Sequence, residues 1–454
     1  MKKDYVIWVS YHKDELVPLH GLKEDEHHRL FATHKDADGE NINIMNPSYS
    51  EMVTMWYVWK NNLKSEYVGF EHYRRHLDVN RLPGKGECQV YKFMDFGDFT
   101  VYEQYSQYHN RHDLDVMLDI LEEKYGKDNG YVKHIKEGHI LISNCTFLMR
   151  WTDFTRLCRF MFPLLEEFGS RFGIEGYDEK ALAKWHKKAY DDFGGYKTEY
   201  QARLVSFVAE RLISAWIDKN LNPFNGVDVV TVHYNTPELT SAAIKSLNKV
   251  SPGCRVFLLD NSDRKPFREK IQNVTVIDNT KGQIIDFEKE LEKYPDRNIE
   301  DAEKFSNFGT AKHLMSVEYM TEYLPDGFIL IDSDILLMKD IRCLVERDFV
   351  CTAVESSKKN VNYFVPFLCW LNVPMMKENG IHYFNGEKTW ALTKKEPDCW
   401  YDTGAWFHEE VVTKGLPWKF ENIWSFLIHY GHGSWRDKPD KMNEWLTKYK
   451  FLYE

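Results

Sequence analysis

Short apolar runs alternate with amphipathic segments through the second half of the chain. Four of the runs are rich in β-branched residues and are bounded by Gly, Asn or Asp, which predicts strands. These runs span residues 227–235, 254–262, 274–279 and 327–334. Apolar residues recur at helical spacing in 236–250 and 302–320. The alternation predicts an α/β domain with a mainly parallel sheet and helices on both of its faces.

The first half combines longer helical patterns with fewer strands. Apolar spacing predicts helices at 46–61, 113–126, 151–169 and 198–221. Strands are expected at 5–10, 66–72 and 139–149. This half is therefore predicted to be a second α/β domain whose C-terminal part is helical.

A cluster of Pro, Asn and Gly separates the two halves. The last amphipathic helix of the first half ends near Asn220, and Pro223, Asn225 and Gly226 precede the next β-branched run. We predict one domain over residues 1–221, a linker over 222–226 and a second domain over 227–454.

Composition and charge exclude several classes of protein. The 454-residue chain has a formal net charge of -11 and a pI of about 5.9, which argues against a general affinity for nucleic acid. The eight cysteines form no C-x-x-C pair, as expected of a reduced, cytoplasmic protein. The N-terminal apolar run is too short for a signal peptide, and no run reaches the ~18 residues of a membrane span.

The predicted strands of the second half end in polar residues that would rim one crevice. The candidate ligand-binding residues there are His233, Tyr234, Asn235, Asp260, Asn279 and Ser333. No glycine-rich phosphate loop is present, so the phosphates must be held in another way. Asp332 and Asp334 form a D-x-D pair that could share Mn²⁺ or Mg²⁺ with a diphosphate. Alternatively, the two aspartates simply cap the following turn.

Residues 227–434 resemble the family 2-like glycosyltransferases of the GT-A fold. The resemblance is carried in order by "VVTVHYNTPELTSAAIKSL", "LLDNS" and "FILIDSD", although the usual arginine-asparagine pair is absent near "SNFGTAKHL". It implies a metal-dependent, inverting transfer from a nucleotide-diphosphate sugar, with UDP favoured, and a role for Asp260 in reading the base or ribose.

The same resemblance implies a catalytic base in "CWYDTGAWFHEEV" and a C-terminal histidine on the metal. Asp402 is preferred as the base because its surroundings are turn-like, and Glu409 and Glu410 are the other candidates. His432 is preferred over His429 as the third metal ligand, and an imidazole ligand favours Mn²⁺.

The first half contains "EYVGFEHYRRHL" after an N-P-x-Y-x-E helix. Both blocks resemble the uncharacterised domain of bacterial capsular polysaccharide synthesis proteins, which implies a second glycosyltransferase. Arg74 and Arg75 could bind a diphosphate without a metal. Alternating strand geometry places only one of them on the face of His72. The remaining candidates for nucleotide-sugar binding are Ser10 and His12. In the alternative interpretation, the arginines pair with Glu51 or Glu71.

Together these patterns predict a bifunctional transferase of capsule or surface-polysaccharide synthesis. Its acceptor would be a lipid-linked glycan at the inner face of the cell membrane. One alternative is a single active C-terminal domain, with an N-terminal domain that binds glycan or positions the acceptor. The other is a carbohydrate-binding scaffold without activity.

Overall fold

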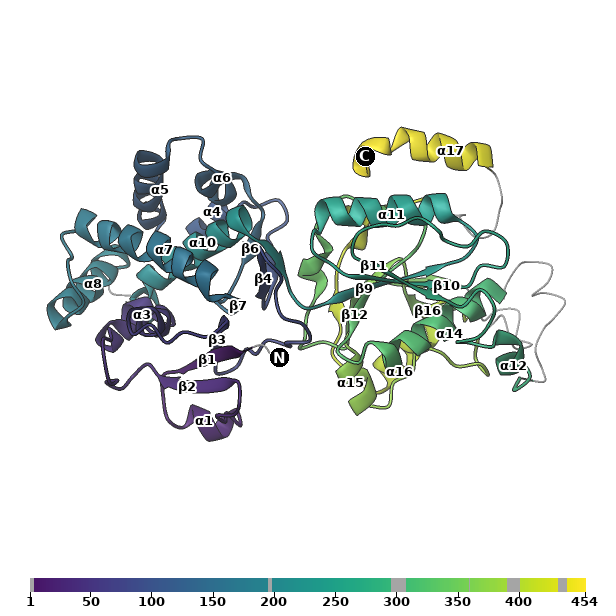
Figure 1. Ribbon diagram of the computed structural model, residues 1–454, viewed down its shortest axis with the longest axis horizontal. Helices are drawn as coiled ribbons and strands as arrows, with labels where there is room; N and C mark the ends of the chain where they lie inside the picture. The colour runs from purple at the N-terminus through teal and green to yellow at the C-terminus, as the bar shows by residue number, and fades with distance from the viewer. Residues whose placement is uncertain (1–3, 195–197, 295–307, 359, 390–400, 432–438) are drawn as a thin grey trace. The chain divides into compact units, whose positions relative to one another are not determined.

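The computed structural model describes residues 4–194, 198–294, 308–358, 360–389, 401–431 and 439–454. The chain forms two compact units, Met1–Gly226 and Val227–Glu454 (Figure 1). Each unit is built around its own mixed sheet, so the prediction of two α/β domains is confirmed. No helix in the described part of the chain is long and apolar enough to cross a membrane.

The first unit contains a six-stranded sheet in the order β2-β1-β3-β7-β4-β8. Its strands are β1 (Tyr5–Tyr11), β2 (His28–Ala32), β3 (Tyr67–His72), β4 (Glu87–Val90), β7 (Phe147–Arg150) and β8 (Asn222–Phe224). A separate antiparallel ribbon joins β5 (Phe93–Asp95) to β6 (Ile140–Ile142). Three of the five pairings in the main sheet are parallel.

Helices make up most of the rest of the first unit. They are α1 (Leu16–Leu19), η1 (Asn43–Met45), α2 (Asn46–Tyr49), α3 (Met52–Lys60), α4 (Val101–Tyr108), α5 (Arg111–Tyr125), α6 (Gly130–Glu137), α7 (Trp151–Arg171), α8 (Glu179–Asp192), α9 (Thr198–Gln201) and α10 (Leu204–Asn220). The predicted helix 46–61 is split into α2 and α3, because Ser50 between them adopts a positive φ of 45°. The helical C-terminal part of the first unit is confirmed.

The second unit contains a seven-stranded sheet in the order β11-β10-β9-β12-β17-β14-β18. Its strands are β9 (Asp228–His233), β10 (Val256–Asp260), β11 (Val274–Asp278), β12 (Phe328–Ile331), β14 (Cys351–Ala353), β17 (Leu368–Leu371) and β18 (Lys419–Phe420). Two antiparallel ribbons join β13 (Ile335–Leu337) to β19 (Leu427–His429) and β15 (Glu355–Lys358) to β16 (Val361–Phe364).

Helices cover both faces of this sheet, with α11 on one face and α14, α15 and α16 on the other (Figure 1). The helical segments are α11 (Pro237–Val250), α12 (Phe287–Leu291), α14 (Phe308–Tyr323), η2 (Ile341–Leu344), α15 (Val373–Glu378), α16 (Ala405–Thr413), η3 (Ile423–Ser425), α17 (Pro439–Lys448) and η4 (Lys450–Leu452). Phe328 and Leu330 of β12 are completely buried in the same core cluster as Leu314 and Val317 of α14. This core fixes the strand whose end carries the two aspartates.

The two main sheets repeat one set of pairings in one chain order. In the first sheet, β1 lies between its parallel neighbours β2 and β3. In the second sheet, β9 lies between its parallel neighbours β10 and β12. Strand β3 then pairs with antiparallel β7, followed by β4 and β8, and β12 likewise pairs with antiparallel β17, followed by β14 and β18. Only β11 has no counterpart, so β3 occupies in the first sheet the position of β12 in the second.

The register of these pairings aligns the two strand ends residue by residue. Tyr67 of β3 and Phe328 of β12 both lie opposite the last residue of their antiparallel neighbour. Four residues later come Glu71 and Asp332. Glu71 therefore takes the place of the first aspartate of the D-x-D pair.

The predicted linker 222–226 is partly a strand. Asn222–Phe224 forms β8, which pairs in parallel with β4 at the edge of the first sheet. The Pro and Asn composition that suggested a linker is compatible with an edge strand, because a proline there needs no partner for a missing N–H group.

Candidate active site

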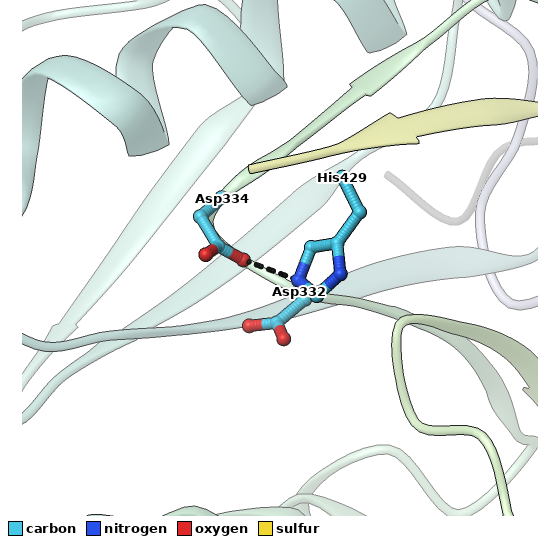
Figure 2. Close-up of side chains that lie close together, drawn as sticks. All are labelled: Asp332, Asp334 and His429. Atoms are coloured by element: carbon cyan, nitrogen blue, oxygen red, sulfur yellow. Dashed lines mark hydrogen bonds and ion pairs between the residues drawn. The ribbon is translucent and has the colours of Figure 1, made fainter. Parts of the chain in front are cut away.

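Asp332, Asp334 and His429 converge at one point of the second unit (Figure 2). The aspartates follow the apolar strand β12, and His429 is the last residue of β19, which pairs with β13 so that Ile335 lies opposite His429. One ligand atom from each residue lies within 4.8 Å of the others, and His429 Nε2 is 3.1 Å from Asp334 Oδ1. Backbone pairing thus brings together groups separated by 95 residues.

The electrostatics of this cluster favour a bound cation. Burial, and then the neighbouring Asp334 carboxylate, raise the pKa of Asp332 to about 7. Burial lowers the pKa of His429, but the hydrogen bond to Asp334 and the charges of both aspartates together outweigh burial, so the net shift of the pKa is upward. Two carboxylates and one imidazole are a donor set that fits a divalent ion such as Mn²⁺, whose charge would offset the repulsion between the carboxylates.

Metal binding at this cluster is expected to weaken as the pH falls. A group with a pKa of about 7 carries a proton below that pH, and the proton competes with the metal. Its ionised fraction falls roughly fivefold from pH 7 to pH 6, so the Kd of Mn²⁺ should rise by at least about that factor, because His429 also takes up a proton. Calorimetric titration at the two pH values measures the change. A Kd that is the same at both would contradict the assignment of Asp332 as a ligand.

The structure places Asp402 beside the start of α14. Asp402 Oδ1 accepts hydrogen bonds from Thr310 Oγ1 at 3.0 Å and from the Thr403 N–H at 2.8 Å. His313, one turn further along α14, has a pKa lowered to about 4 by burial, and the charge of Asp402 opposes that shift. Asp402 is therefore held in one orientation by two donors while it stays partly exposed.

The other two carboxylates of this segment have partners of their own. Glu409 accepts a hydrogen bond from the Tyr401 hydroxyl and lies 3.7 Å from Lys388 Nζ. Glu410 accepts a hydrogen bond from the His382 N–H. These contacts fit structural roles for both glutamates.

Three of the predicted nucleotide-binding residues are turned into the protein. His233 is completely buried, with Nδ1 2.8 Å from Thr240 Oγ1 and Nε2 3.2 Å from the Lys265 carbonyl. The Asp260 carboxylate accepts two backbone N–H groups of the following loop. Asn279 is buried, and its amide forms four hydrogen bonds, to Asn261, Ile284 and Ile285. These side chains hold the strand ends and loops in place, and their polar atoms are already satisfied.

The remaining candidates for ligand binding are Tyr234 and Asn235, which follow β9, and Ser333, which follows β12. Tyr234 and Asn235 both donate to the Asp263 carboxylate, at 3.2 Å and 2.6 Å. Asn235 has a positive φ of 59° and also accepts two backbone N–H groups. Ser333 is buried, and its N–H donates to Asp332. The preferred metal-binding histidine, His432, lies outside the described residues.

In the first unit, the residues predicted from "EHYRR" line a cavity of about 300 Å³. Its walls come from the ends of β1, β2 and β3, from α2 and the turn that follows it, and from the residue just before α10. The lining residues are Ser10, Tyr11, His12, Thr33, Asn46, Pro47, Ser50, Glu51, His72, Tyr73, Arg74 and Arg203. Of the predicted residues here, only Arg75 is not among them. Ser50, with its positive φ, lies in the wall, as strained residues at binding sites often do.

The cavity holds the Arg74 and Arg203 guanidinium groups together with one carboxylate, Glu51. Burial raises the pKa of Glu51, and the charge of Arg203 opposes that shift. Within the part of the chain that the structure describes, Arg74 and Arg203 form no ion pair, and Arg74 only approaches the Tyr73 ring. Burial, and then the charges of Arg75 and Arg74, lower the pKa of His72 to about 3, so its imidazole is neutral at pH 7. His72 Nε2 lies 3.4 Å from Glu51, and its buried Nδ1 has no hydrogen-bond partner among the described residues.

Glu71, which occupies the place of Asp332, is not part of the cavity. Its carboxylate is buried and accepts hydrogen bonds from His76 Nδ1 and the Leu77 N–H, both at 2.8 Å. The alternative pairing of Glu71 with the arginines is therefore wrong. The first unit thus carries guanidinium groups, and no exposed D-x-D pair, at this strand end.

Two residues of these clusters have only a weak signal in the sequence. Arg203 stands in an ordinary amphipathic pattern, and its one signal is an arginine just before the apolar face of α10. The sequence favours His432 over His429, since nothing in it reveals that β19 pairs with β13. His429 lies in the cluster, and the choice between the two histidines stays a prediction.

Comparison with known proteins gives the following similarities. WbbM, described as a bifunctional glycosyltransferase, is 16% identical with a TM-score of 0.38, covering 93% of this chain and 87% of that one. The galactosyltransferase LgtC is 12% identical, with a TM-score of 0.29 and coverage of 43% and 74%. The glycosyltransferase GlyE of Streptococcus pneumoniae TIGR4 is 12% identical, with a TM-score of 0.29 and coverage of 49% and 63%. No curated protein matches the chain. The model of a domain of unknown function, DUF4422, matches residues 6–95 and 90–184.

Proposed function

We propose that this chain is a nucleotide-sugar-dependent glycosyltransferase with two active sites, one in each unit. The observation that carries the proposal is the convergence of Asp332, Asp334 and His429 beyond the carboxyl end of a central parallel strand. Ligands of open α/β sheets bind at this edge. A donor set for a divalent cation at this position suits a substrate that contains a diphosphate.

In the second unit, the three residues would hold Mn²⁺ or Mg²⁺, which would neutralise the charge on the leaving diphosphate. Asp402 takes the proton of the acceptor hydroxyl as that oxygen attacks the anomeric carbon from the opposite face, so the configuration is inverted. The hydrogen bonds from Thr310 and Thr403 keep the carboxylate aimed in one direction while it acts.

In the first unit, Arg74 and Arg203 take over the neutralisation of the diphosphate. Guanidinium groups bind phosphate oxygens through charge-assisted hydrogen bonds, and in a cavity these bonds are stronger than in water. Neutral His72 can donate or accept one hydrogen bond to the sugar or phosphate. The equivalence of β3 and β12 in their sheets supports this assignment.

The donors we propose are nucleotide-diphosphate sugars, with UDP-sugars favoured. The acceptor is proposed to be a lipid-linked glycan of a bacterial capsule or surface polysaccharide, reached from the cytoplasm at the inner membrane face. The support for this role is the resemblance of the 46–61 and 69–75 blocks to capsular polysaccharide synthesis proteins.

Nucleotide release tests the proposal. The chain is incubated with a panel of UDP-, GDP- and CDP-sugars and a bacterial lipid extract, with either Mn²⁺ or EDTA. We expect two components, one that requires Mn²⁺ and one that persists in EDTA. A manganese-dependent component alone would leave the first unit as a glycan-binding or acceptor-positioning domain. No release from any donor would contradict the proposed function.

A further inference from the structure

Aromatic rings lead from the metal cluster to the surface of the second unit. The Phe367 ring packs on the His429 imidazole with centroids 3.8 Å apart, and Trp424 meets Phe367 edge-on at 5.8 Å. Phe367 directly precedes β17, and its carbonyl accepts the Asp332 N–H at 3.0 Å. Trp424 lies in η3, just before β19. The Trp424 position is therefore tied to the cluster through both the ring contacts and the backbone.

Half of the Trp424 surface is exposed, which is unusual for a residue so costly to leave in water. Its neighbour Ile423 is completely buried, and Phe426 is nearly so, so η3 is anchored by its other side chains. The exposure of Trp424 is thus not needed to hold η3 in place. An exposed indole with a fixed support is typical of a binding surface.

We propose that Trp424 is the surface on which a sugar ring of the acceptor stacks, an inference that rests on the proposed function. Indole offers a flat apolar face for the C–H groups of a sugar and leaves the sugar hydroxyls in water. The donor sugar adjoins the diphosphate at Asp332 and Asp334. The acceptor hydroxyl must come within about 3.5 Å of the donor's anomeric carbon, which puts the acceptor ring one sugar further from the cluster. Trp424 is separated from His429 by the Phe367 ring, a spacing that matches the position of the acceptor ring.

Saturation-transfer NMR on the full chain with Mn²⁺ and UDP tests this assignment. The probes are the methyl glycosides of D-galactose, D-glucose, D-mannose and N-acetyl-D-glucosamine. We expect transfer to the ring protons of at least one probe, a Kd at least tenfold higher in Trp424→Ala, and a Kd within about threefold of the native chain in Trp424→Phe. Phe451→Ala is the matched control, because Phe451 is even more exposed in the same unit.

Three results would overturn the inference. They are the absence of transfer from every probe in the native chain, an equal Kd in Trp424→Ala, and a tenfold loss of UDP affinity in Trp424→Ala. The last result would assign the indole to the donor. Nucleotide release is measured separately, so glycoside binding that depends on Trp424 without any release would uphold the binding surface and reject the proposed transferase.

Discussion

Asp334→Asn is expected to lower the manganese-dependent part of nucleotide release by roughly 10³-fold, since a catalytic metal contributes several kcal/mol of charge stabilisation. Asparagine has the shape of aspartate and keeps one oxygen that can accept from His429, so the fold should survive the change. The substitution removes one of the two carboxylate charges that would bind the metal. The rate of release with Mn²⁺, minus the rate in EDTA, measures the effect, and circular dichroism checks the fold.

The matched control is Asp326→Asn, the same change at an exposed aspartate just before β12. It should leave the manganese-dependent rate unaltered. His429→Ala should weaken Mn²⁺ binding at least tenfold, and His432→Ala separates the two histidines, because only the true ligand gives this loss. Full manganese-dependent turnover in Asp334→Asn would reject the metal site.

The sequence was sufficient to predict the fold class and the aspartate pair, for physical reasons that lie within single segments. An apolar run such as Phe328–Ile331 can only be buried, and carboxylates that follow it must emerge at the edge of the sheet. Alternation of strands and helices then dictates parallel pairing, because parallel neighbours need a crossover. These inferences need no knowledge of distant parts of the chain.

The same local reasoning could not tell which polar strand ends face the crevice. His233, Asp260 and Asn279 stand at strand ends just as Asp332 does, yet their side chains bond to neighbouring loops and to α11. Asn and Asp readily bond to backbone N–H groups a few residues ahead, and such bonds compete with any ligand. A polar residue after a strand is therefore equally compatible with a site and with a turn.

Long-range placement was the second limit. Arg203 enters the cavity from α10, whose start lies more than a hundred residues after the strands that form the cavity's other walls. The environment of Glu71 could not be predicted either. Glu71 aligns with Asp332 in the register of the sheet, yet its carboxylate bonds to His76 and Leu77. Pairing partners and side-chain directions of this kind follow from the assembled sheet, which no single segment encodes.

The ends of β12 and β3 carry groups of opposite charge, and each would compensate the charge of a diphosphate differently. At the end of β12, carboxylates need a cation before they can face a diphosphate, because like charges about 4 Å apart repel by roughly 4 kcal/mol at a surface-like dielectric constant. At the end of β3, the corresponding carboxylate of Glu71 is turned inward and the guanidinium groups face the cavity directly. Binding of a nucleoside diphosphate should therefore depend on metal in one unit and be independent of it in the other.

This difference predicts that Arg74→Ala and Arg203→Ala will each weaken UDP binding in EDTA by about 10- to 100-fold, the range for a lost hydrogen bond to a charged group. Asp334→Asn is the background, so that the second unit does not contribute, and calorimetry measures the Kd. Neither arginine forms an ion pair among the described residues, but the charge of Arg203 stabilises the Glu51 carboxylate, so circular dichroism of each variant checks that the fold is kept. Arg75→Ala should have a smaller effect, because Arg75 does not line the cavity, and Arg159→Ala on exposed α7 surface should have none. UDP affinity that is unchanged in the Arg74→Ala/Arg203→Ala double variant would show that the cavity does not hold the diphosphate.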